Sequence, residues 1–180
     1  MHELTDHELY QAFSYARSLD EGQGKQIMAQ LALDQPDLYQ TLFGVFPAII
    51  AEHHQEMAYL FMDLCFDVLC VFQYLFGELP YNGNDPVWLE KQAVLVDIDL
   101  QALIRSNSMD AIVWKNLQDR FTKPSPHEFL QTGLVTALNE AIDGHAALNT
   151  SRVQATKITQ NLMFVVVKLL CTLYNSPTKH

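Results

Sequence analysis

The chain has 180 residues, of which 49% are hydrophobic and only 18% are charged, and its formal net charge is -10. Nucleic acids and anionic membrane surfaces attract clustered lysines and arginines, whereas the 11 basic residues here are scattered, so neither is an expected partner. This length suits one domain, and we expect residues 1–180 to form a single unit.

Helix signals begin at the N-terminus. Thr5, with Glu8 three residues later, is the pattern of a capping box, and it predicts a helix that ends near Leu19. Gly22 and Gly24 follow, and we expect them to separate this helix from the next. Two further helices are expected, at 25–33 and 36–43.

The most apolar part of the chain predicts a long central helix at about 47–76, after Gly44 and Pro47 end or kink the preceding one. This helix is apolar over most of its circumference, which is typical of a helix buried at the centre of a fold. A second apolar helix is expected at about 151–174. These two should be the inner pair of an antiparallel bundle of six or seven helices, an all-α fold.

The middle of the chain is less regular. A loop is expected at 77–85, because it contains two glycines, a proline and an Asn-Gly pair. Asp85 and Pro86 then begin another helix. The segment 94–100 alternates like a strand but has no second strand to pair with, so it is read as helix with a break near its aspartates. Helices are further expected at 108–121 and 126–142, the latter ending at Gly144.

An acidic stripe on the central helix is the candidate functional site. At about 100° per residue, Glu56, Asp63 and Asp67 fall within roughly 60° of Glu52. Three interpretations of this stripe are possible. Its carboxylates are hydrated at the surface or lie in an interface, or they are neutralised by Lys168 or Lys157 on the last helix, or they bind a divalent metal.

In the metal alternative, all four carboxylates are ligands and His53 or His54 adds a nitrogen, since helical bundles hold metals with inward-facing carboxylates and histidines. The spacing fits this poorly. No Glu of this helix is followed by His at the third position, and the two histidines point about 100° and 200° away from Glu52. His127 and His145, at the two ends of a later helix, are expected to be solvated or to cap it.

The two most apolar runs, 57–76 and 162–174, approach the length of a membrane span. The first has Asp63 and Asp67 near its middle, each costing about 2.5–3.5 kcal/mol in a bilayer. The second is too short and contains Lys168. Both are therefore predicted to be core helices of a protein without a membrane partner.

Three cysteines lie in apolar helical runs, as expected of reduced, buried thiols in the cytoplasm. With so little charge and no catalytic motif, the sequence favours a cytoplasmic bundle that acts by protein–protein association, as a homodimer. The alternatives are a carboxylate metalloenzyme that uses the acidic stripe, and a bundle whose aromatic-rich core binds a small apolar ligand.

Overall fold

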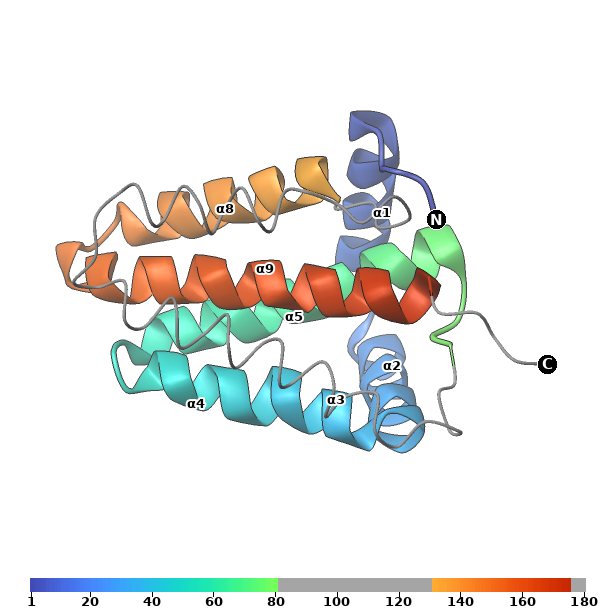
Figure 1. Cartoon of the computed structure of the whole chain (residues 1–180), viewed down its shortest axis with the longest axis horizontal. Helices are drawn as coiled ribbons and strands as arrows, with labels where there is room; N and C mark the ends of the chain where they lie inside the picture. Colours follow the sequence, from blue (N-terminus) through green and yellow to red (C-terminus); the bar gives the residue numbers. More distant parts are fainter. Residues whose placement is uncertain (81–130, 176–180) are drawn as a thin grey trace.

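The computed structural model describes residues 1–80 and 131–175, and within these ranges the chain is helical and has no strand (Figure 1). The predicted all-α class is therefore confirmed. The predictions made for 86–130, which include segment 94–100 and His127, lie outside the described residues.

The first helix, α1 (Asp6–Ser18), begins with the predicted capping box. The Thr5 hydroxyl accepts a hydrogen bond from the Glu8 amide at 3.3 Å, and the Glu8 carboxylate accepts one from the Thr5 amide at 2.8 Å. These bonds favour the ionised carboxylate, and the backbone bond from Thr5 is the first cause that lowers the pKa of Glu8 to about 2.

The prediction that Gly22 and Gly24 separate two helices is wrong. Both glycines lie in the first turn of α2 (Glu21–Asp34). A second capping box explains this: the Gln23 amide donates to Asp20 Oδ1 at 2.8 Å, and the Asp20 amide donates to the Gln23 side chain at 3.0 Å. The cap starts the helix before the glycines are reached, and the remaining helix outweighs their low propensity.

After a break at Gln35, helical backbone runs continuously from Pro36 to Ala51 and includes a π-helical turn. The elements are α3 (Pro36–Gln40), the π-helix η1 (Thr41–Val45) and α4 (Phe46–Ala51). The Phe46 amide donates to the carbonyl of Thr41, five residues back. This wider turn accommodates Pro47, which has no N–H to donate, so Gly44 and Pro47 widen the helix instead of ending it.

The predicted central helix at about 47–76 is in fact two helices. α4 ends at Ala51, the chain turns through Glu52, His53 and an extended His54 (φ -163°, ψ 115°), and α5 (Gln55–Phe76) runs back. Folding back lets α4 bury its apolar face against α5. α5 ends at Gly77, whose φ of 88° is readily adopted only by glycine.

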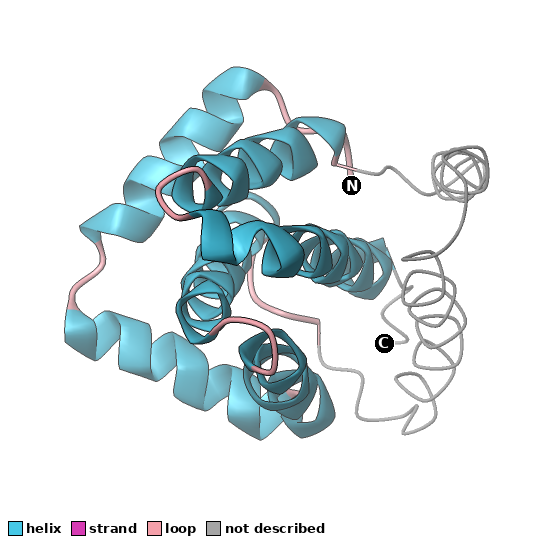
Figure 2. Ribbon diagram, turned by 90° about the vertical axis from the view of Figure 1, so that its left-hand side faces the viewer, coloured by secondary structure: helices cyan, strands magenta, loops and turns pink. Residues whose placement is uncertain are grey.

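A second helical hairpin is formed by α8 (Thr132–Ala146), the short 3-10 helix η3 (Thr150–Arg152) and α9 (Val153–Asn175). The last helix lies where it was predicted, but α8 continues through Gly144 and His145 and does not end at the glycine. Figures 1 and 2 show that the turns of the two hairpins lie at the same end of the bundle, whereas α1 and α2 cross the opposite end.

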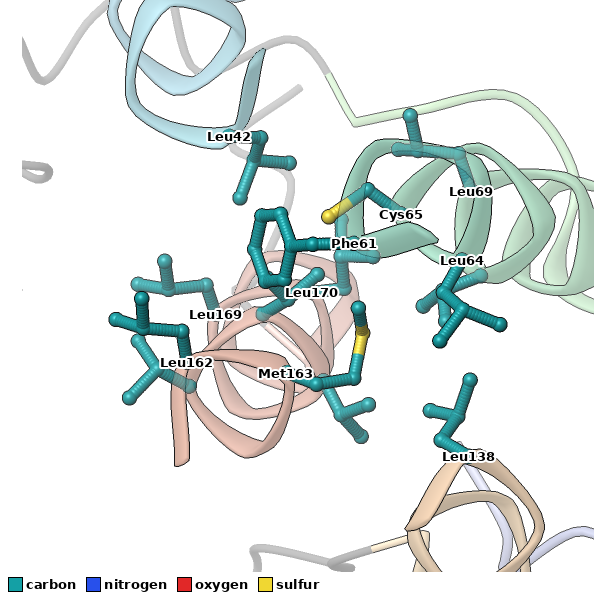
Figure 3. Packing of buried hydrophobic residues seen from close by; sticks show 14 of the residues in the cluster. Leu42, Phe61, Leu64, Cys65, Leu69, Leu138, Leu162, Met163, Leu169 and Leu170 are labelled. Carbon is teal, nitrogen blue, oxygen red and sulfur yellow. The ribbon is translucent and has the colours of Figure 1, made fainter. Parts of the chain in front are cut away.

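α5 and α9 pack against each other at the centre, which confirms the predicted inner pair. Figure 3 shows Phe61 of α5 between Leu42 of η1 and Leu170 of α9, and the rings and leucines around it are fully buried. Both helices are long and apolar enough to cross a membrane. In the fold, 44% of the most apolar window of α5 and 56% of that of α9 are buried.

Candidate functional site

The structure divides the predicted acidic stripe. Glu52 is exposed at the end of α4, and only Glu56, Asp63 and Asp67 belong to α5. Glu56 and Asp63 are exposed, and Asp67 is half-buried. Within residues 1–80 and 131–175, no group of three or more His, Cys, Asp or Glu side chains is arranged to hold a metal ion.

Asp67 is the carboxylate of the stripe that burial affects most. Burial raises its pKa, the positive charge of Arg17 on α1 lowers it, and the negative charge of Asp63 raises it again. The positive charge that lowers the pKa of Asp67 therefore comes from α1. α1 crosses α5 near this point, and Tyr15 stacks on Tyr74 with 4.9 Å between ring centroids.

Glu56 takes part in the principal polar contact of the described chain. It pairs with Arg152 Nη2, and Arg152 Nη1 donates to the carbonyl of His145 at 2.7 Å. Arg152 is only 9% exposed, so this is a buried cation. The hydrogen bond and the charge of Arg152 together lower the pKa of Glu56. One guanidinium thus ties the start of α5 to the end of α8.

A second contact joins the same two turns. His54 Nε2 lies 3.2 Å from Ser151 Oγ, and the Ser151 hydroxyl donates to Asn149 Oδ1 at 2.9 Å. A serine hydroxyl has one proton, so Ser151 must accept from His54 Nε2–H, and the neutral imidazole then carries a bare Nδ1. In this tautomer His54 cannot take a proton from Ser151, which argues against a nucleophilic serine.

We call this cluster of His54, Glu56, His145, Ser151 and Arg152 the turn junction. Three of its buried polar atoms have no hydrogen-bond partner among the described residues. They are His54 Nδ1, His145 Nε2 and Arg152 Nε. The Nε–H of an arginine points to the same side as Nη2, so a small rotation of the Glu56 carboxylate would satisfy it with the second oxygen.

Sequence reasoning did not find Arg152. It is the only arginine of the described range 131–175, but nothing in its neighbours marks it as buried. It also did not find Gln131, which is fully buried. The Gln131 side chain accepts from the Leu4 amide at 2.8 Å and donates to the His2 carbonyl at 2.7 Å, so it fixes the N-terminal segment beside α8.

An apolar ligand site in the core receives little support. The aromatic side chains of α5 that we considered for it pack against leucines, as Figure 3 shows for Phe61. A surface groove of about 450 Å³ lies where α2 meets α5, and Phe66 and Met28 line it. Gly24 forms part of this contact, since a Cβ there would lie 3.4 Å from the Phe66 ring.

The three cysteines form no disulfide and are buried, as predicted. Burial raises the pKa of Cys65 strongly and that of Cys70 to about 12. Because the thiolate is the reactive species, we expect no thiol of the described residues to react with Ellman's reagent in the folded protein at about pH 8. All three should react after unfolding in guanidinium. Rapid reaction of one thiol without denaturant would contradict the packing around α5 or α9.

No protein-family model, no curated protein and no solved structure matches this chain.

Proposed function

We propose that this protein acts in the cytoplasm through protein–protein association, as a homodimer, and that the end of the bundle beside the turn junction forms the contact. The observation that carries the proposal is the exposure of two large apolar side chains there. Leu148 is 78% exposed and Val153 is 64% exposed, and they lie on either side of the buried Arg152 and its short helix.

An exposed leucine and an exposed valine that flank the same short helix gain free energy when a partner excludes water from them. The turn that carries them contains few charges to oppose contact, because Arg152 is buried and paired with Glu56. Figure 2 looks onto this end, where both hairpin turns are accessible. The low charge content of the whole chain, 18%, also favours a surface that is partly covered by another protein. The absence of a disulfide among the three cysteines agrees with a reducing compartment.

Light scattering coupled to a sizing column tests the proposal. We expect the wild type to have about twice the 20.5 kDa mass of the chain. The double variant Leu148→Asp, Val153→Asp should run as a monomer with an unchanged circular dichroism spectrum, because two buried carboxylates would oppose association. The matched control is Leu33→Asp on α2, which is 75% exposed and lies at the opposite end, and which should remain a dimer.

A wild type that stays monomeric at high micromolar concentration would contradict the association itself. A double variant that still dimerises would contradict only the location of the contact.

A further inference from the structure

The surface groove where the corner between α1 and α2 meets α5 has an apolar floor and a charged rim. Its volume is about 450 Å³, within the range of about 300–1,000 Å³ that ligand sites occupy. The floor is formed by half-buried residues, namely Leu19, Gly24, Met28 and Phe66. The rim is formed by exposed charged residues, namely Asp20, Glu21 and Lys25. A partner that places an apolar side chain on this floor would remove apolar surface from water.

Gly24 keeps the floor of the groove open. It lies in the first turn of α2, and a Cβ at this position would lie 3.4 Å from the Phe66 ring. Among the described residues, that ring supplies the only atoms within 4 Å of such a Cβ. A leucine at position 24 would therefore extend into the groove. Since leucine has a higher helix propensity than glycine, it would fill the groove without weakening α2.

The part of the chain that contains the groove is strongly acidic. Arg17 and Lys25 are the only basic residues among Lys and Arg in residues 1–80, against twelve aspartates and glutamates. Lys25 pairs with Glu21 at 2.5 Å. Arg17 acts electrostatically on Asp67 of α5. Both cations are thus close to carboxylates, and the excess of negative charge around the groove remains.

This excess of negative charge determines which partner fits the groove. Lysines or arginines beside an apolar side chain would be attracted to the rim, whereas carboxylates would be repelled. A second copy of the chain is a poor occupant, because it has the same net charge of -10. Figure 1 shows α1 and α2 at the end of the bundle away from the two hairpin turns, so the proposed homodimer contact would not cover the groove.

We propose that this groove binds a segment of another protein in which a large apolar side chain is flanked by lysines or arginines. The apolar side chain lies against Phe66 beside Gly24, and the flanking cations face Asp20 and Glu21. One anchor and a few solvent-screened charges give a weak, reversible contact. The proposal does not depend on the homodimer, because the two contacts lie at opposite ends of the bundle.

Three short peptides of equal length test the proposal. The probe is acetylated and amidated Lys-Lys-Phe-Lys-Lys, and the two comparison peptides replace its Phe by Ala or all of its Lys by Glu. Amide chemical shifts of the isotope-labelled protein detect dissociation constants up to about 1 mM. We expect the probe to shift the resonances of Gly24 and Phe66, and both comparison peptides to bind at least about tenfold more weakly.

Variants of α2 then locate the contact. Gly24→Leu should weaken binding of the probe at least about tenfold, because the leucine occupies the groove. The matched control is Gln26→Leu, which is exposed, points about 200° away on the same helix and should bind like the wild type. Glu21→Ala should weaken binding and Lys25→Ala should strengthen it, each roughly twofold to fivefold at low ionic strength. Both charge effects should fade in high salt.

The absence of any shift at Gly24 and Phe66 with about 1 mM probe would overturn the proposal. Equal binding of the Lys and Glu peptides would contradict selection by charge, and equal binding of the Phe and Ala peptides would contradict an apolar anchor. Unchanged affinity in Gly24→Leu with a wild-type circular dichroism spectrum would place the contact elsewhere. The two charge variants, Glu21→Ala and Lys25→Ala, leave the floor intact, so identical affinities for them would overturn the proposal independently.

Discussion

Replacing Phe61 by alanine should lower the free energy of unfolding by about 3–5 kcal/mol. Phe61 is 0% exposed, and its ring meets Phe46 of α4 edge-on at a centroid distance of 6.2 Å. Figure 3 shows that the ring extends from α5 into the space between η1 and α9. The change removes contacts with both hairpins and leaves a cavity that closely packed leucines can fill only in part.

Urea denaturation checks this result. An unchanged slope of the unfolding free energy against urea concentration would show that the unfolded state is unaffected. The matched control is Tyr59→Ala on the same helix, where the side chain is 54% exposed and the loss should stay within about 0.5 kcal/mol. Similar losses for the two variants would mean that Phe61 is not at the centre of the core.

The second prediction concerns the ion pair of the turn junction, where the two partners differ in burial. Arg152→Met should cost about 1–3 kcal/mol, because the His145 carbonyl loses its donor while Glu56 remains hydrated. Glu56→Ala should also lower the melting temperature, because it removes the acceptor of a hydrogen bond from Arg152, whose side chain is buried. The double variant should be no worse than the more damaging single change, which a double-mutant cycle of thermal melts would show.

The exposed pair of Glu21 and Lys25, joined at 2.5 Å across one turn of α2, is the matched control. Glu21→Ala should leave the melting temperature nearly unchanged, because solvent screens both charges. If Glu56→Ala behaves in the same way, Arg152 is hydrated in solution and its contact with Glu56 does not stabilise the fold.

The sequence predicted the parts of this fold that local chemistry determines. Thr5 and Glu8 define a helix start through contacts between near neighbours, and the apolar spacing of 151–174 defines a helix independently of its surroundings. The break at His54 was missed because no glycine or proline lies between Ala51 and Gln55. There the backbone leaves the helix so that α4 can pack on α5, which is a tertiary effect.

The candidate site was only partly predictable for a related reason. Helical periodicity identified Glu56 as part of an acidic stripe but gave no information about its partner, because Arg152 is 96 residues away in the chain. The same periodicity assigned Glu52 to the stripe, which fails once the helix ends at Ala51. Which residues pair across such distances depends on how the hairpins dock. The docking of two hairpins cannot be derived from helical periodicity in a single sequence.

The two inner helices also determine when the chain can fold during synthesis. α5 is complete at Phe76 and can pack against α1 and α4, which precede it, but α9, which covers the rest of its buried surface, begins only at Val153. At about 5–20 residues per second, a ribosome needs roughly 4–15 s to make the intervening segment. Throughout that interval the surface of α5 that α9 later covers can meet other nascent chains, so the speed of translation between these helices and the presence of a chaperone should influence how much soluble protein a cell obtains.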